Sequence, residues 1–248
     1  MLQWGNTAQM GASWARCWLY GPSGGGKTTA AAFFPSPFFV LVYNENSQTT
    51  LRGLGRMLGT SFNYVVIGAP QQNVASALAQ VQSDFEQLCN VLLEAAASGT
   101  LTQRFGESIV LDNMTHYNDL VVSEIAGGSS RKKMEKQEWG VLRNHYLHVR
   151  DVLWRLPAHI VFTSLASART DASNTLVAAG PSVQGAGGEL LPSSCDALGY
   201  CDTDLQGQRV VHFKQQGRFP ARHRYPGMTD GPIPTHQLWP TMAPFLGH

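Results

Sequence analysis

Residues 21–29 read GPSGGGKTT and come directly after the apolar run CWLY. The pattern G-x-x-x-x-G-K-[ST] is typical of a phosphate-binding loop, because its glycines let backbone N–H groups close around phosphate oxygens. A flexible glycine turn is the alternative, but a strand before the loop and a helix after it favour nucleotide binding. Lys27 is expected to reach the β and γ phosphates, and Thr28 to bind Mg²⁺. The expected nucleotide-binding residues are Gly21, Pro22, Ser23, Gly24, Gly25, Gly26, Lys27, Thr28 and Thr29.

Strand-like and helix-like segments alternate along the rest of the chain. Apolar runs predict strands at 15–20, 37–45, 107–113, 159–164, 197–203, 208–214 and 220–225. Helical spacing predicts helices at 27–34, 73–99, 116–125 and 139–156. The order predicts an α/β fold, a mostly parallel central sheet with helices on both faces and an antiparallel C-terminal edge. We expect one domain over 1–248, with an N-terminal arm or strand at 1–15 and a C-terminal tail at 227–248.

Composition limits the partners that the chain can have. Eighteen Lys and Arg against 17 Asp and Glu give a formal net charge of +1, so any nucleic-acid site must be local. Only 14% of the residues are charged, against roughly 25% in an average soluble domain, which indicates that neighbouring subunits cover part of the surface. No apolar run reaches the ~20 residues that span a bilayer, so no membrane segment is expected. Four cysteines without a CxxC pair, and a start that does not read as a secretory leader, predict a cytoplasmic protein.

Two acidic residues come at the ends of predicted strands. Asp112 ends SIVLD and is a candidate Mg²⁺ ligand, although an Asp in this place also commonly caps the next helix. Residue 113 is Asn, whereas many ATPases place Glu directly after the metal-binding Asp. Glu45, in VLVYNEN, is therefore the candidate to activate water, provided that its strand neighbours the strand of the phosphate loop. Its alternative is a solvated carboxylate at a strand end.

These residues in this order, followed by HIVFTS at 159–164, resemble the RecA-type ATPase core. The chain is most similar to the short phage-encoded RecA-core ATPases of single-strand annealing and recombination. The resemblance covers roughly residues 16–226, and only the phosphate loop is specific by itself. It implies ATP as the nucleotide with Mg²⁺ as the metal ion, a water-activating role for Glu45 and a metal-binding role for Asp112.

The resemblance also implies two DNA-binding loops. They correspond to GGSSRKKMEKQ at 127–137 and to the segment 167–188, which is rich in Gly, Ser and Ala and is expected to be a mobile loop. A solvated helix start and a simple insertion are the respective alternatives. The expected DNA-binding residues are Arg131, Lys132, Lys133, Lys136 and Arg169.

A late segment, RVVHFKQQGRF at 209–219, resembles the strand whose two basic residues reach the neighbouring subunit's ATP site. Lys214 matches the first position, but Gln216 occupies the second, so that Arg218 is the expected substitute and Arg222 a further candidate. The glutamine sensor of the family is replaced by Leu165, and the adjacent Ser164 is the nearest polar residue.

The function expected from these features is that of a DNA-dependent ATPase of phage recombination. It would act on single-stranded DNA as a head-to-tail ring or filament, with a phage single-strand-binding protein as a possible partner. A packaging motor or ring helicase, a small-molecule kinase and a nucleotide-bound structural protein are the alternatives. A motor would usually add a nuclease domain or an N-terminal domain, and a kinase would close an arginine-bearing lid over the phosphates.

Overall fold

A computed structural model describes residues 13–43, 47–69, 80–127, 134–170, 176–185 and 187–247. Its centre is a ten-stranded sheet with the order β10-β8-β7-β1-β5-β4-β2-β3, to which β6 is added beside β5 and β9 beside β7. The strands are β1 (Arg16–Gly21), β2 (Pro37–Val42), β3 (Asn63–Ile67), β4 (Ser108–Asp112), β5 (His159–Thr170), β6 (Leu176–Pro181), β7 (Ala197–Thr203), β8 (Arg209–His212), β9 (Arg222–His223) and β10 (Ile233–Pro234). The six neighbouring strands β7, β1, β5, β4, β2 and β3 are all parallel to one another.

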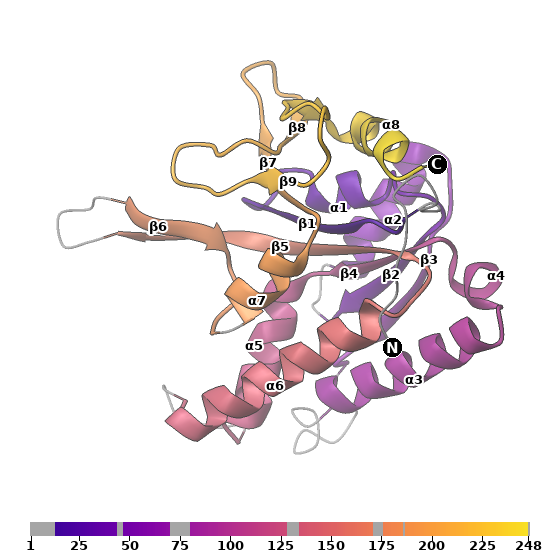
Figure 1. Cartoon of the computed structure of the whole chain (residues 1–248), viewed down its shortest axis with the longest axis vertical. Helices are drawn as coiled ribbons and strands as arrows, with labels where there is room; N and C mark the ends of the chain where they lie inside the picture. The colour runs from indigo at the N-terminus through magenta and orange to yellow at the C-terminus, as the bar shows by residue number, and fades with distance from the viewer. Residues whose placement is uncertain are drawn as a thin grey trace, which may run out of the picture.

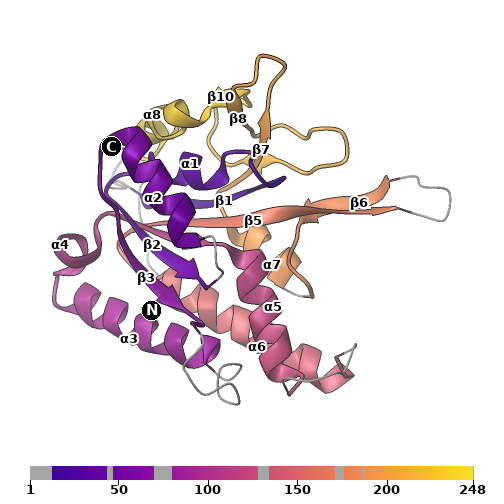
Figure 2. The ribbon, with the colours of Figure 1, turned by 180° about the vertical axis from the view of Figure 1, so that it is seen from behind.

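Helices cover both faces of this sheet (Figures 1 and 2). The helices are α1 (Lys27–Ala31), α2 (Ser47–Leu58), α3 (Val81–Ala97), α4 (Leu101–Phe105), α5 (Met114–Ile125), α6 (Lys136–Leu153), α7 (Gly187–Ser194) and α8 (Leu238–Met242), with short 3₁₀ turns at Thr235–Gln237 and Ala243–Phe245. Helices α1, α2 and α8 pack on one face, and α3, α5, α6 and α7 on the other. In the described part of the chain, no helix combines the length and the apolar character that crossing a bilayer requires.

Strand β1 shows how the sequence divides into two cores. Trp18 and Tyr20 point into the core under α3, α5 and α6, whereas Cys17 and Leu19 point into the core under α1, α2 and α8. All six residues of β1 are buried, because the strand is central and covered on both sides. A continuous apolar run is therefore the expected signature of this strand.

The predicted fold class is confirmed. The parallel strands, the helices on both faces and the antiparallel pairing of β8 and β9 with β7 and of β10 with β8 all agree with the alternation in the sequence. The prediction missed α2, β3, the short helix α4 and, within the expected C-terminal tail, β10 and α8. Residues 73–79, the expected start of the long helix, lie outside the described residues, and the described helix begins at Val81.

The segment 167–188 is mostly not a loop, so this expectation was wrong. Strand β5 continues to Thr170 and pairs antiparallel with β6, from Ala166 opposite Pro181 to Thr170 opposite Leu176. The two strands form a hairpin arm that projects away from the rest of the sheet (Figures 1 and 2). Its Ala, Ser and Gly residues have weak intrinsic strand preference, and backbone pairing rather than side-chain type forms the hairpin.

Polar groups inside the α5–α6 contact make the stability depend on pH. The Tyr117 hydroxyl lies 2.8 Å from Nε2 of His145, and the Tyr146 hydroxyl donates to Asn118. Burial, with a smaller effect of nearby His148, lowers the pKa of His145 to about 4. His145 therefore serves the packing of α5 against α6, and the described residues contain no cluster of three metal-ligating side chains.

We predict that neutral His145 stabilises the fold above its unfolded pKa of about 6.5 and that this contribution is lost as the pH falls toward 4. The unfolding free energy of the wild type should fall by up to roughly 3 kcal/mol more between pH 7 and pH 4 than that of His145→Gln. Urea denaturation at several pH values measures this. His148→Gln, at an exposed site, should keep most of the wild-type pH dependence, because burial is the main cause of the lowered pKa of His145. Equal pH profiles for His145→Gln and wild type would contradict the prediction.

Candidate nucleotide-binding site

The phosphate loop connects the end of β1 to the start of α1. Gly24 and Gly26 have φ values of 80° and 87°, in the left-handed region that favours glycine. At Gly21 the constraint is contact with the neighbouring strand, since an added Cβ would lie 2.1 Å from the backbone oxygen of Cys201 on β7. Both constraints require glycine, so the spacing of glycines in the sequence is set by the backbone of the loop and of β7.

Lys27 lies inside the loop that it is expected to serve. Its Nζ donates to the backbone oxygens of Gly21, at 3.1 Å, and of Pro22, at 2.7 Å. The side chain is 8% exposed, and burial lowers the pKa of Lys27 below its ordinary value, partly offset by Cys201 and Asp112. The ammonium group is thus held by carbonyls of the loop itself, where bound phosphate oxygens would compete for it.

Two hydroxyl groups converge on the carboxylate of Asp112. Thr28 donates to Oδ2 at 2.9 Å, and Thr163 on β5 donates to Oδ1. Hydroxyl and carboxylate oxygens are the ligands that Mg²⁺ prefers, usually with water and phosphate oxygens completing its shell. Thr28 and Asp112 are therefore adjacent oxygen donors that fit a magnesium ion bound together with a nucleotide.

The helix-capping role that was the alternative for Asp112 belongs to the next residue. Asn113 is the N-cap of α5, and its side-chain oxygen accepts from the backbone N–H of His116 at 2.9 Å. Asp112 is thus free of the capping role, and its two oxygens face Thr28 and Thr163. Its metal role stays a prediction.

Thr163 is the site residue that sequence reasoning missed. Ser164 was the expected polar stand-in for the sensor, but it is fully buried and accepts from the Trp18 indole at 2.9 Å, so this expectation was wrong. Successive residues of a strand point to opposite faces, and only the register of β5 beside β4 shows that Thr163 is the one facing Asp112. A polar residue one position earlier in FTSL was the available signal.

Glu45 lies outside the described residues, and the condition attached to it fails. Strands β1 and β2 are not neighbours, because β5 and β4 lie between them. Strand β2 instead pairs with β4, with Leu41 opposite Asp112. Strand β2 therefore ends beside Asp112 rather than beside β1, and the role of Glu45 stays a prediction.

The expected DNA-binding residues are only partly described. Arg131, Lys132 and Lys133 lie outside the described residues, and of Arg169 only the backbone, in β5, is described. Lys136 is the exposed first residue of α6, between Glu135 and Glu138, whose side chains form a capping box. These two carboxylates stabilise the N-terminus of α6, and their negative charge offsets part of the local positive charge.

The three candidates for a basic residue acting on a neighbouring subunit differ in their surroundings. Arg222 donates to the backbone oxygens of Pro192, Ser193 and Cys195 at the end of α7, so it serves the fold. Lys214 and Arg218 are exposed in the turn between β8 and β9. They stay candidates for the trans-acting role.

A pocket of about 400 Å³ adjoins the last residue of the phosphate loop. Thr29, Phe33 and His236 line it, and the Phe33 and His236 rings lie edge to face at 6.2 Å. Arg209 at the start of β8 crosses beside it, with Nη1 3.4 Å from the Thr29 hydroxyl. Aromatic and apolar walls with a few polar groups are typical of a site for a planar ligand group.

The loop at the end of β1, the adjacent carboxylate at the end of β4 and the parallel sheet define a P-loop nucleotide-binding protein of the ATPase type. Over residues 13–225 the sequence matches a family model described as an AAA domain, so the chain belongs to that family. No curated protein matches the chain.

Among solved structures, the chain is similar to an ATPase from the type III secretion system of pathogenic bacteria. The two are 12% identical, the match covers 77% of this chain and 51% of that chain, and the TM-score is 0.44. The chain thus spans about half the length of that ATPase.

We predict that Thr163→Val weakens the binding of Mg²⁺ together with the nucleotide, since Asp112 loses one of two hydroxyl donors. A hydrogen bond to a charged group contributes about 1.5–3 kcal/mol, so the Mg²⁺ concentration for half-maximal binding should rise about ten-fold or more. Mg²⁺ titration of ATP binding measures this. Thr163→Ser should restore the wild-type value, and Ser164→Ala should leave it unchanged. An unaltered Mg²⁺ requirement in Thr163→Val would show that Thr163 does not position Asp112 for Mg²⁺.

Proposed function

We propose that the chain is a Mg²⁺-dependent ATPase that is stimulated by single-stranded DNA. The observation that carries the proposal is the contact between Thr28 at the end of the phosphate loop and Asp112 at the end of β4. It brings a phosphate-binding loop and a metal-binding carboxylate together in the arrangement that phosphoryl transfer requires. When bound, Mg²⁺ and ATP supply the electrophilic phosphoryl group; Lys27 binds its phosphates and Glu45 orients the attacking water.

The pocket beside Thr29 supports adenine or another base as the remaining part of the ligand. A base in this pocket, against Phe33 and His236, would lie next to the helix that the phosphate loop opens. Arg209 would then contact the ribose or a phosphate from the β8 side. The same nucleotide would span the loop and this pocket.

Single-stranded DNA is the proposed effector, and two features support it. Four of the 18 basic residues occur within the six positions from Arg131 to Lys136, in a chain of net charge +1. The β5–β6 hairpin projects from the sheet and carries Arg169 on β5, six residues beyond Thr163, which donates to Asp112. A local basic cluster and an extended arm suit contact with a nucleic-acid backbone.

Recombination as a head-to-tail oligomer is the proposed biological setting, and it rests on the resemblance of the motifs to phage RecA-core ATPases. Lys214 and Arg218 would reach a neighbouring ATP site from their exposed turn. A packaging motor, a helicase and a small-molecule kinase share the phosphate loop, and they differ in their response to single-stranded DNA.

We expect single-stranded DNA to raise the rate of ATP hydrolysis several-fold, and Lys27→Ala to abolish ATP binding without unfolding the chain. Reversing Lys132 and Lys133 to Glu should remove the stimulation but not basal ATP binding, and should reduce the logarithmic salt slope of DNA binding by about 1.4. Steady-state ATPase assays and DNA-binding titrations at several salt concentrations measure these effects. A hydrolysis rate that ignores DNA would leave the kinase or a structural role.

Lys214→Ala combined with Arg218→Ala should abolish DNA-stimulated hydrolysis while ATP binding by each subunit remains. Mixing this variant with Lys27→Ala should restore part of the rate, because each supplies what the other lacks across a subunit interface. The measurement is the ATPase rate of the mixture against that of each variant alone. Arg222→Ala is a matched comparison that should lower the melting temperature instead, since Arg222 binds carbonyls of α7. Strict additivity in the mixture would exclude action between subunits.

A further inference from the structure

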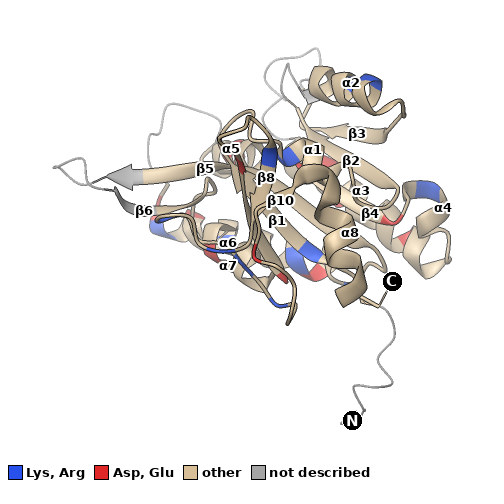
Figure 3. Ribbon diagram, turned by 90° about the horizontal axis from the view of Figure 1, so that it is seen from above, with Lys and Arg blue, Asp and Glu red and all other residues tan. Residues whose placement is uncertain are grey.

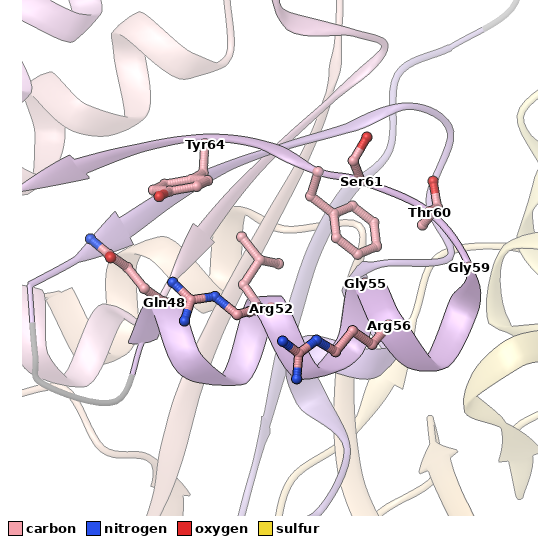
Figure 4. Close-up of a pocket in the computed structure, with 10 residues that line it drawn as sticks. Gln48, Arg52, Gly55, Arg56, Gly59, Thr60, Ser61 and Tyr64 are labelled. Carbon is pink, nitrogen blue, oxygen red and sulfur yellow. The ribbon is translucent and has the colours of Figure 1, made fainter.

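A second pocket, of about 640 Å³, lies between α2 and β3 at the end of the sheet (Figure 4). Its volume is within the range of small-molecule sites. None of its lining residues belongs to the phosphate loop or to the pocket beside Thr29. Two of the lining residues, Gly55 and Thr60, are in close contact. The Thr60 N–H donates to the Gly55 oxygen at 3.0 Å, and an added Cβ on Gly55 would lie 2.8 Å from the Thr60 oxygen.

The charge in this pocket has one sign. Arg52 and Arg56 are four residues apart, so they lie on the same face of α2 one turn from each other. The segment 47–69 contains no Asp or Glu, and in Figure 3 α2 carries Lys or Arg colouring and no acidic colouring. Neither guanidinium has an ion-pair or hydrogen-bond partner within the described ranges. Two unpaired guanidinium groups on one face are donors suited to phosphate oxygens.

The pocket also offers a flat aromatic surface. Tyr64, from the outermost strand β3, is 48% exposed, although a large aromatic side chain is normally well buried. Figure 4 shows its ring at the same end of the pocket as Gln48 and Arg52. Gln48 and the hydroxyls of Thr60 and Ser61 add neutral hydrogen-bonding groups.

We propose that this pocket binds a phosphate group joined to a planar base, the unit common to single-stranded nucleic acid and to a free nucleotide. The phosphate lies between Arg52 and Arg56, and the base stacks on Tyr64 with Gln48 at its edge. An acidic peptide would use the arginines but not the ring, and an apolar partner would leave both guanidinium groups unpaired. Only a ligand with both parts uses the whole pocket.

The test uses the full chain with two probes, a fluorescently labelled (dT)20 strand and N-methylanthraniloyl-AMP. The AMP arm is done in the Lys27→Ala background so that the phosphate loop does not contribute. Arg52→Ala combined with Arg56→Ala should weaken one or both probes at least ten-fold, with the salt slope for the strand reduced by about 1.4. Loss of (dT)20 binding alone identifies a strand as the ligand, and loss of AMP binding alone identifies a free nucleotide.

Tyr64→Ala should weaken the same probe about five-fold to a hundred-fold, and Tyr64→Phe should keep the wild-type affinity, because the ring and not the hydroxyl makes the contact. Arg104→Ala combined with Arg155→Ala removes the same charge at exposed sites elsewhere and should have little effect. Basal ATP hydrolysis should be unchanged in the Arg52 and Arg56 variant, which also shows that it folds. The proposal is overturned if both probes bind this variant as they bind the wild type, or if the control double variant loses as much affinity.

Discussion

The carboxylate of Asp112 is the point at which three separate parts of the chain meet. Asp112 ends β4. Its carboxylate accepts one hydrogen bond from Thr28, on the helix that follows the phosphate loop, and another from Thr163 on β5. A buried or half-buried carboxylate is costly unless its oxygens are hydrogen-bonded, so this position depends on Thr28 and Thr163 being in place. The order of the central strands, β1-β5-β4, is what places all three side chains at the same edge.

That dependence explains which features could be predicted from the sequence. The phosphate loop is constrained locally by left-handed backbone at Gly24 and Gly26, and a local constraint leaves a readable pattern in the sequence. Gly21 is constrained instead by contact with the distant strand β7. Asp112 was predictable because it ends an apolar strand after that loop. Thr163 was not, because its role depends on the register between β5 and β4, which no spacing within one strand reveals.

The errors in the fold prediction have similar physical causes. Strand β3 and helix α2 lie at the margin of the sheet, where half-exposed residues weaken the apolar pattern. More than half of the residues in the paired part of β5 and β6 are Ala, Ser or Gly, whose side chains give little strand signal, so that backbone pairing defines the hairpin. Residues that pack on both faces, as in β1 and β4, gave the reliable part of the prediction.

Strand β5 connects the candidate site to the projecting arm without any intervening turn. Thr163, which donates to Asp112, and Arg169, which lies in the hairpin, are six residues apart on one strand, or about 20 Å at the usual rise. The part of β5 near Thr163 is held by β1 and β4, while the part near Arg169 pairs only with β6. The arm and Thr163, one of the two donors to Asp112, therefore lie on one continuous strand.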